Sequence, residues 1–335
     1  MPLPTMRAAV AESFGGPDVL QVRKIAVPEI ATDEVLVQVA YAGLQPADAA
    51  TRAGWVPPGA AAVSPLIPGN EFSGTIAAIG KNVSGFELGD PVLGFRVFGC
   101  SAEYVAVPAS QVIRKPAALP WDVAGALSAS GQTAHTALEA LSVTAGETVI
   151  VHGAAGGVGT IFVQLALRAG TTVIGTAGAE NQDYLHSLGA VAVEYGTGQL
   201  SRLRAAISEH SGSGRADAVL DAAGHGSLRT AVELVADRSR IGSIAEPPLA
   251  DELGGLFIRS QRSAERLYEL AELTAKGYLT VPIRHRYRLE EIVEAHRAIE
   301  AGHGRGKMVL EVHQPQDMTG HGAHTEDLEY IGIEL

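Results

Sequence analysis

Cysteine is almost absent from this sequence, because the 335 residues include only one, Cys100. A single cysteine excludes an internal disulfide framework, and it also excludes a zinc or iron–sulfur site built from clustered cysteines. We expect the Cys100 thiol to lie near a turn and to be chemically inert.

Positive charge and long apolar runs are also scarce. Lys and Arg number 25 against 37 Asp and Glu, which gives a net charge of −12. This balance is unfavourable for binding nucleic acid or anionic membranes. No apolar stretch approaches the roughly 18 residues of a membrane span, and the first residues lack the apolar region of a signal peptide. We therefore expect a cytoplasmic protein with no nucleic-acid or membrane partner.

The composition that remains is typical of a folded protein. Hydrophobic residues make up 46% and charged residues 19% of the chain, and 335 residues are enough for two domains. From Arg7 to about Leu119 the sequence has short alternating or β-branched runs such as 34–39, 74–79 and 102–107. Turn residues separate these runs, so the pattern predicts a barrel-like, all-β region.

From Trp121 onward the pattern changes to long helical segments that alternate with single strands, which predicts βαβ units and a parallel sheet. The six strands that we expect are 148–152, 172–176, 191–194, 217–221, 240–244 and 256–259. After them we expect a helix at 264–276, a strand at 281–287, a helix at 289–300 and a strand at 307–312.

These patterns predict an α/β protein with two domains and a tail. Residues 1–120 would form the first domain, completed by 279–312, and residues 121–278 would form the second. The segment 313–335 is polar and rich in glycine, so we expect a flexible tail. Its histidines, His321 and His324, lack a third ligand in fixed register, and we expect no metal site there.

The glycines at positions 153, 156 and 159 are the most informative feature. They follow a β-branched strand and precede a helical pattern that runs from Thr160 to Arg168. Such a turn lets backbone N–H groups approach a pyrophosphate, and the helix directs its positive N-terminal end at the anion. We expect a dinucleotide to contact the residues of this turn: Gly153, Ala155, Gly156, Gly157, Val158 and Gly159.

The end of the second predicted strand favours NADPH over NADH. An NAD site usually has an acidic residue there for the ribose hydroxyl, but this strand ends with Thr176, Ala177 and Gly178. The nearest acid, Glu180, is more simply a favourable charge at the next helix N-terminus. We expect the backbone from Ala177 to Glu180, together with Tyr195, to bind the 2′-phosphate.

Several ordered motifs resemble a known family, the zinc-free, quinone oxidoreductase-like (zeta-crystallin-like) branch of the medium-chain dehydrogenase/reductase superfamily. The resemblance covers residues 7–312. It implies a GroES-like β-barrel catalytic domain beside a Rossmann domain, with the active site in the cleft between them. The motifs are Gly43–Asp48 with Arg52 and Gly54, Pro68–Gly74 continuing to Gly80, Phe86–Val92, Gly131–Ala134, the glycine turn, Val219–Asp221, Ala295–His296 and Gly302–Lys307.

Two amides stand where zinc-dependent relatives have zinc ligands. This chain has Gln45 in place of a cysteine and Asn70 in place of a histidine, and the four cysteines of the structural-zinc lobe are missing. Amides lack the character that holds zinc, so we expect no metal. Without a Lewis acid, reduction of an electron-poor π-system is a better fit than oxidation of an alcohol.

The resemblance implies roles for further residues. Gln45 is the expected active-site amide, and Tyr41 is a weaker candidate for a proton donor, because a tyrosine at a strand end more often packs in the core. Trp55, Val56 and Asn70 are expected to line the substrate pocket. Thr133 and the backbone of Phe257, Ile258 and Arg259 are expected to contact the nicotinamide.

Other polar residues have simpler interpretations. Ser128 and Ser130 lie where relatives meet the nicotinamide, but they could equally cap a helix. We expect Asp48 and Arg52 to pair with each other. Glu71 and Asp90 are expected to fix turns of the barrel, and His135 and His152 to pack or form hydrogen bonds without a carboxylate partner.

We therefore predict a zinc-independent, NADPH-dependent oxidoreductase that transfers hydride to a quinone or an α,β-unsaturated carbonyl. One alternative is a biosynthetic reductase of enoyl thioesters or polyketide enones. A second is a protein that binds NADPH without catalysis, because the pocket lacks the tyrosines common in the family. The resemblance also implies a homodimer joined by edge strands near Leu256, and a small-molecule electron acceptor as the substrate.

Overall fold

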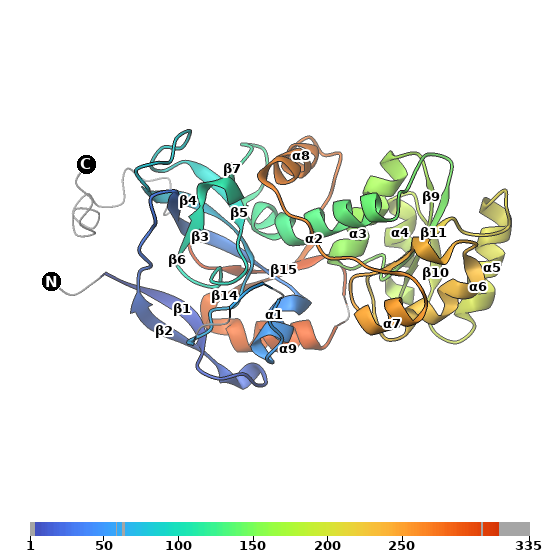
Figure 1. Cartoon of the computed structure of the whole chain (residues 1–335), viewed down its shortest axis with the longest axis horizontal. Helices are drawn as coiled ribbons and strands as arrows, with labels where there is room; N and C mark the ends of the chain where they lie inside the picture. Colours follow the sequence, from blue (N-terminus) through green and yellow to red (C-terminus); the bar gives the residue numbers. More distant parts are fainter. Residues whose placement is uncertain (1–3, 58, 62–63, 303, 315–335) are drawn as a thin grey trace.

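The computed structural model describes residues 4–57, 59–61, 64–302 and 304–314. It has two lobes that lie side by side, one built mainly from the first 120 residues and the other from the middle of the chain (Figure 1). No helix among the described residues has the length and apolar character needed to span a membrane.

The first lobe contains a sheet of seven strands in the order β14-β15-β3-β4-β5-β7, with β6 also paired to β3. All neighbours are antiparallel except β14 and β15, and a separate hairpin joins β1 to β2. The strands are β1 (Thr5–Ala11), β2 (Leu20–Ala26), β3 (Glu34–Leu44), β4 (Glu71–Ile79), β5 (Pro91–Phe95), β6 (Tyr104–Pro108), β7 (Val112–Arg114), β14 (Ile283–Arg288) and β15 (Lys307–Glu311).

The C-terminal segment returns to this first lobe, as the sequence predicts. Strand β15 pairs with β3, with Met308 opposite Leu44, and α9 (Ile292–Glu300) packs near α1 (Pro46–Arg52). Residues of both segments share one hydrophobic core, which includes Leu44 and Met308. The predicted tail lies mostly outside the described residues, since only His313 and Gln314 of it are described.

The second lobe is a six-stranded parallel sheet in the order β10-β9-β8-β11-β12-β13. This order, with helices on both faces, is that of a doubly wound Rossmann sheet and confirms the predicted fold class. The elements are β8 (Thr148–His152), α3 (Gly157–Arg168), β9 (Thr172–Ala177), α4 (Gln182–Ser187), β10 (Val191–Glu194), α5 (Gln199–His210), β11 (Ala218–Asp221), α6 (Ala231–Leu234), β12 (Ile241–Ser243), α7 (Pro247–Glu252), β13 (Leu256–Phe257) and α8 (Ala264–Ala275).

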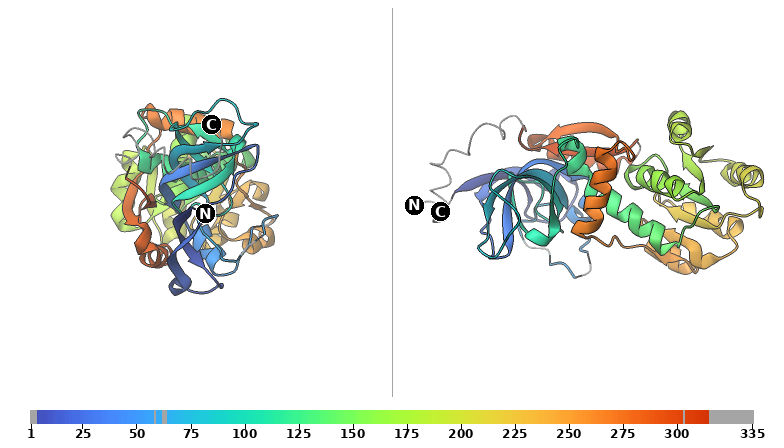
Figure 2. Two further views of the ribbon diagram at one scale, coloured as in Figure 1. Left: turned by 90° about the vertical axis from the view of Figure 1, so that its left-hand side faces the viewer. Right: turned by 90° about the horizontal axis from the view of Figure 1, so that it is seen from above.

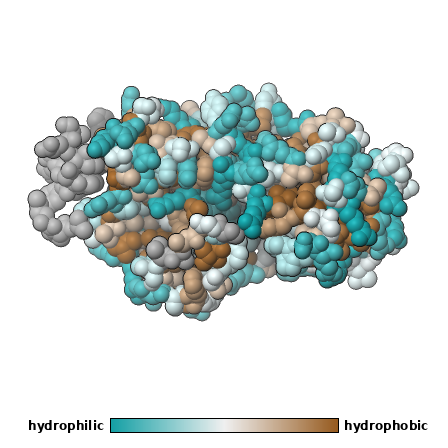
Figure 3. All heavy atoms as spheres, in the orientation of Figure 1, coloured by the Kyte–Doolittle hydropathy of each residue, from teal (hydrophilic) through white to brown (hydrophobic). Residues whose placement is uncertain are grey.

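Strand β8 shows why this sheet needs continuous apolar runs. Val149 and Val151 belong to a core shared with α3 and α8, whereas Ile150 belongs to a second core shared with α5. Because successive side chains point to opposite faces, the middle of a strand covered on both sides is apolar at successive positions. Figure 3 shows that the outer surface, in contrast, mixes polar and apolar atoms over both lobes.

Helix α2 (Trp121–Ala140) links the two lobes. It contacts β3 and β4 of the first lobe as well as α3 and α8 of the second. Seen from above, it runs from one lobe into the other (Figure 2). The division of the chain into domains at residues 120 and 279 stays a prediction.

Gly125 lets α2 lie directly on β3. A Cβ atom at Gly125 would lie 2.8 Å from both the Cβ and the carbonyl oxygen of Tyr41. Neither atom can move without moving the strand. The close packing of helix on sheet therefore depends on the absence of a side chain here.

We expect Gly125→Ala to lower the free energy of unfolding by about 1–3 kcal/mol, the usual cost of overpacking a core. Gly131→Ala is the matched control in the same helix, because its new Cβ would meet leucine side chains rather than backbone: a Leu270 methyl at 3.1 Å and a Leu127 methyl at 3.4 Å. That control gains helix propensity and should be neutral or slightly stabilising. Equal denaturation midpoints for both variants would contradict this packing argument.

Candidate active site

The predicted glycine turn connects β8 to α3. Gly153 has a φ of 72°, in the region that favours glycine, and its carbonyl accepts a hydrogen bond from the N–H of Gly156 at 3.0 Å. A Cβ at Gly159 would lie 2.1 Å from the Gly153 carbonyl oxygen. Gly156 is the N-cap of α3, so Gly157, Val158 and Gly159 form the first turn of the helix, where backbone N–H groups lack intrahelical partners. The turn has the form of an anion-binding site.

The C-terminal segment also contacts this turn. The N–H of Gly306 donates to the carbonyl of Ala155 at 2.8 Å, and Gly306 forms a parallel bridge with Gly156. The Lys307 side chain and Ser130 both lie against Gly157. A Cβ atom at Gly157 would be 2.8 Å from Cδ of Lys307 and 3.0 Å from the Ser130 hydroxyl oxygen. A bound dinucleotide would therefore lie near both lobes.

The end of β9 presents backbone rather than side chains. Thr176 and Ala177 are buried, and the Thr176 hydroxyl lies 3.1 Å from Nδ1 of His152. The Gln182 amide donates to the carbonyls of Ala177 and Gly178. Tyr195 is 49% exposed beside this edge, and its N–H donates to the Ala177 carbonyl. These contacts leave Tyr195 accessible to a ligand.

Arg305 supplies the positive charge that sequence reasoning did not find here. Its guanidinium stacks on the Tyr184 ring at 4.3 Å, and its Nε donates to Asn181 Oδ1 at 3.2 Å. The motif around Gly302–Lys307 was visible in the sequence, but its contact with the residues after β9 was not. A cavity of about 460 Å³ opens beside this arginine, lined by Glu180, Asn181, Pro282, Ile283, Arg284, Gly304 and Arg305.

Gln45 and Asn70 come together on Asp48 in the first lobe. Gln45 is the N-cap of α1, and its N–H donates to Asp48 Oδ2 at 3.0 Å. Asn70 Nδ2 donates to Asp48 Oδ1 at 3.2 Å. Two buried atoms, Gln45 Nε2 and Asn70 Oδ1, have no hydrogen-bond partner among the described residues. A donor and an acceptor are therefore left for a ligand.

Burial dominates the electrostatics of Asp48. It raises the pKa of this carboxyl from 3.8 to about 7, although the Lys307 charge and the N–H donors of Gln45 and Asn70 act in the opposite direction. The predicted pair of Asp48 with Arg52 is wrong. Arg52 is buried between helices, where its guanidinium binds Glu300 and the Gly15 carbonyl instead.

Glu71 does not fix a turn, and that prediction is also wrong. It is fully buried, and its Oε1 lies 2.9 Å from Lys307 Nζ. Its Oε2 accepts a hydrogen bond from the N–H of Ala129 in α2 at 2.6 Å. Asp90 does fix a turn, because its Oδ2 accepts from the Glu87 N–H at 2.7 Å.

Among the described residues, Tyr41 makes no hydrogen bond to the Gln45 amide. Burial raises the pKa of its half-buried hydroxyl, and the charged groups that act on it are Glu311, Asp122 and Arg286. None of these belongs to the group around Asp48. The structure thus gives no geometric support to Tyr41 as a proton donor.

The predicted residues of α2 face different ways. Ser128 and Ser130 lie in the middle of α2 and not at its end, so the helix-capping interpretation is wrong. The Thr133 hydroxyl is half-buried and donates to the Ala129 carbonyl at 2.6 Å. The Ser128 hydroxyl accepts from the Gln132 amide at 2.9 Å. Ser130, beside the glycine turn, is the nearest of these to the expected pyrophosphate site.

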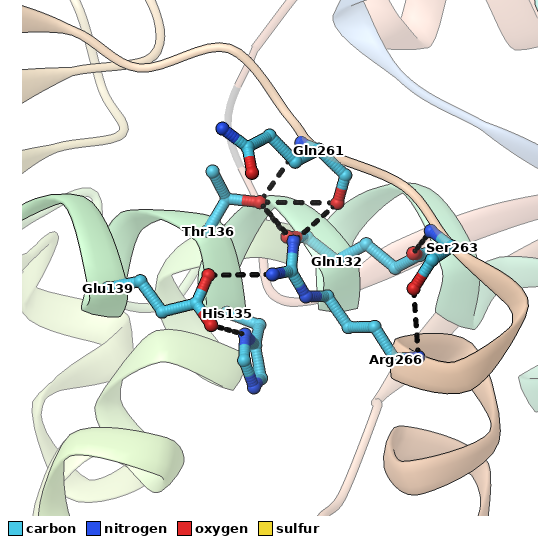
Figure 4. A network of polar contacts seen from close by, with 7 residues as sticks. All are labelled: Gln132, His135, Thr136, Glu139, Gln261, Ser263 and Arg266. Carbon is cyan, nitrogen blue, oxygen red and sulfur yellow. Dashed lines mark hydrogen bonds and ion pairs between the residues drawn. The ribbon is translucent and has the colours of Figure 1, made fainter.

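A row of polar side chains on α2 anchors the segment between β13 and α8 (Figure 4). Gln132 Oε1 accepts from the N–H of Ser263 at 2.7 Å, and the Thr136 hydroxyl accepts from the N–H of Gln261 at 3.0 Å. Arg266 donates to Thr136 and to Glu139. This network fixes Gln261 and Ser263, which follow shortly after the residues 257–259 that are predicted to contact the nicotinamide.

The residues predicted to contact the nicotinamide, Phe257 at the end of β13 and the two that follow it, divide between core and surface. Ile258 is buried in the core, whereas Phe257 is 37% exposed and stacks against the exposed Arg259. Any contact of Ile258 with a ligand must therefore use its backbone. In the first lobe, Trp55 is 48% exposed and Val56 half-buried just after α1, while residues 58, 62 and 63 further along lie outside the described residues.

The remaining predicted residues are structural. His152 is buried, and burial lowers its pKa from 6.5 to about 4, so it is neutral near pH 7. His135 does have a carboxylate neighbour, contrary to expectation, because Glu139 lies 3.5 Å from its Nδ1. Cys100 is fully buried, and burial raises the pKa of its thiol, which agrees with an inert residue.

The raised pKa of Asp48 makes a prediction about stability. The folded state holds the proton up to about pH 7, whereas the unfolded chain releases it near pH 4. The free energy of unfolding should therefore fall by a few kcal/mol as the pH rises from about 4 to 7. Above pH 7 it should level off. In Asp48→Asn this contribution is absent. Denaturant unfolding of both proteins across this range checks it, and parallel stability profiles would contradict the raised pKa.

Two protein-family models match the chain. The alcohol dehydrogenase GroES-like domain matches residues 31–117, and the zinc-binding dehydrogenase family matches residues 188–310. These matches fall on the first lobe and on a segment that runs from the parallel sheet back to the first lobe.

Individual proteins are similar to most or to about half of this chain. The quinone oxidoreductase of Homo sapiens is 31% identical over 328 residues, which cover 91% of this chain and 97% of the relative. The NADPH-dependent alkenal/one oxidoreductase of Arabidopsis thaliana is 35% identical over 205 residues, covering 57% of this chain and 52% of the relative. A mycobacterial protein solved in complex with NADPH is 27% identical with a TM-score of 0.80, covering 92% of this chain and all (100%) of the other.

The similarity to a full-length relative agrees with the GroES-like lobe, the doubly wound sheet and the glycine turn. The chain therefore belongs to the medium-chain dehydrogenase/reductase superfamily, in its quinone oxidoreductase-like branch.

Proposed function

We propose that this protein is a zinc-independent, NADPH-dependent reductase that transfers hydride to a quinone or an α,β-unsaturated carbonyl. The observation that carries the proposal is the pair of unpartnered amide atoms on Gln45 and Asn70. They offer one donor and one acceptor to an uncharged ligand. The names of the similar human and Arabidopsis enzymes support the same class of acceptor.

The residues present fit a dinucleotide. At Gly159 a side chain would collide with the Gly153 carbonyl, so the turn keeps its backbone open to a phosphate. The first turn of α3 would hold the pyrophosphate, and Thr133 with the backbone of 257–259 would contact the nicotinamide. When bound, NADPH supplies the hydride.

The preference for NADPH rests on Arg305, Tyr195 and the lack of an acid at the end of β9. Arg305 reaches Asn181, directly after this strand, and presents a planar guanidinium suited to a phosphate monoester. Tyr195 is exposed at the same edge. The similar mycobacterial structure that contains NADPH supports this choice.

A catalytic zinc does not fit the site. The two aligned ligand positions hold the amides of Gln45 and Asn70, and Asn70 already donates its Nδ2 to Asp48. Carboxamide oxygens are poor zinc ligands beside thiolate and imidazole. Among the described residues, no group of three or more His, Cys, Asp and Glu side chains is placed to hold a metal.

In the proposed reaction, the chain acts mainly by positioning. Holding donor and acceptor in contact removes the entropy of encounter, which is worth up to about 7–11 kcal/mol in favourable cases. Gln45 Nε2 donates a hydrogen bond to the acceptor oxygen and stabilises the charge that develops there. Asp48 keeps the Gln45 backbone and the Asn70 amide in place, and water supplies the final proton.

Homodimer formation is the proposed quaternary state. Strand β13 is the edge of the parallel sheet, and its Leu256 and Phe257 are each 37% exposed. An exposed apolar edge strand favours pairing with a second copy.

Removing the Gln45 amide tests the reaction itself. We expect Gln45→Leu to slow hydride transfer on the order of 10²-fold, because one donor to the developing oxyanion is lost. The dissociation constant of NADPH should change little. Stopped-flow oxidation of prebound NADPH by a panel of quinones and enones measures both, with the exposed Gln21→Leu as control. An unchanged rate on an acceptor that the wild type reduces would remove Gln45 from the mechanism.

Removing the Arg305 charge tests the cofactor. We expect Arg305→Gln to weaken NADPH binding about tenfold to a hundredfold, the usual worth of a charge-assisted hydrogen bond, while NADH binding stays the same. Fluorescence titration with each nucleotide gives the ratio. Arg288→Gln, at a 72% exposed arginine paired with Glu291, is the control. Equal losses for NADPH and NADH would show that Arg305 does not select the phosphate.

A further inference from the structure

Arg262 reaches from the second lobe to the amides of the first. It lies between β13 and α8, on the segment that the α2 network anchors, and its Nη1 donates to the backbone carbonyl of Asn70 at 3.0 Å. Its guanidinium also lies 6.0 Å from the centre of the Phe95 ring. No motif in the sequence pointed to this residue.

Arg262 forms no ion pair with a carboxylate of the described residues. Both oxygens of Asp48 accept from Gln45 and Asn70, and both oxygens of Glu71 accept from Lys307 and Ala129. Among the described residues, no carboxylate lies within ion-pair distance of Arg262, and Nη1 is its one donor with a hydrogen-bond partner.

The surroundings of Arg262 strengthen its electrostatic interaction with charge that lies close to it. Burial lowers its pKa, while the nearby Glu71, Cys100 and Asp48 groups act in the opposite direction. The side chain nevertheless keeps intermediate exposure to solvent. A cation in such a place interacts strongly with charge that appears beside it, because little water screens it.

We propose that Arg262 faces the acceptor oxygen together with Gln45 Nε2 and stabilises the oxyanion formed by hydride transfer. The Asn70 carbonyl places the guanidinium beside the amides, and the α2 network holds its backbone. The site then takes acceptors whose reduction puts negative charge on oxygen, and quinones are the acceptors that form the most stable such anion. This inference rests on the proposed function and deepens it.

The chemistry balances without a further reactant. The quinone receives a hydride, which carries two electrons, and becomes a hydroquinone monoanion, while the dihydronicotinamide is oxidised to its cation. A proton from water then gives the neutral hydroquinone. Arg262 stays protonated throughout and acts only through its charge and N–H groups.

A purely structural role is the main rival, because the hydrogen bond to Asn70 also ties the lobes together. Arg262→Gln separates the two roles, because it keeps an N–H donor on a polar side chain but removes the charge. Arg266→Gln is the comparator, because it loosens the same segment by removing bonds to Thr136 and Glu139 while Arg262 keeps its charge.

The test uses 4-nitrophenol, whose phenolate mimics the hydroquinone anion and whose ionisation is visible as a yellow absorbance. It is titrated with pH in the presence of the NADP⁺ complex of each variant. In wild type and in Arg266→Gln we expect the bound phenol to ionise at a lower pH than in solution. In Arg262→Gln we expect the phenolate to bind about tenfold to a hundredfold more weakly, with the neutral phenol unaffected.

Two outcomes would overturn the inference: no fall in the ionisation pH with wild type, or the same fall in Arg262→Gln. Thermal melting of each variant shows that it is folded. Failure of the proposed function would give a different result. The wild-type protein would lower the ionisation pH of the bound phenol, but none of the quinones or enones would oxidise its bound NADPH. A wild type that turns over quinones while Arg262→Gln binds phenolate normally would reject the Arg262 role alone.

Discussion

The buried ion pair between Glu71 and Lys307 joins the parts of this molecule that form the site. Both side chains are almost inaccessible, and the second Glu71 oxygen accepts a hydrogen bond from α2. Leaving one of these charges buried alone would be strongly unfavourable, so β4, β15 and α2 must come together. The Lys307 side chain also lies against Gly157 at the start of α3, which places the glycine turn next to the first lobe.

Much of the fold could be predicted because its signals are local. Strands β8 and β10 have the bounds that the β-branched runs indicate, and the glycine turn follows where the spacing places it. Strand β13 ends two residues earlier than expected, at Phe257, since the residues after it leave the sheet to bind the polar row on α2. Tertiary contacts overrode the apolar pattern there.

The candidate site could be predicted only in part. Gln45 and Asn70 were identified because they replace metal ligands at aligned positions. Arg52 lies four residues from Asp48, which suggested a pair, yet it binds Glu300, 248 residues away. Arg305 likewise meets Asn181 across 124 residues. Spacing in the sequence carries no information about contacts over such separations, which only the folded chain brings together.

The path of the chain has a consequence for how the protein is made. Residues of the parallel sheet are inserted between β7 and β14, and β15 pairs with β3 only after the whole second lobe has been synthesised. During translation, the emerging first lobe has an open edge at β3 and a Glu71 without its lysine. Closing this edge therefore waits for long-range contacts from strands made after the second lobe, and until then the first lobe has an unpaired strand edge.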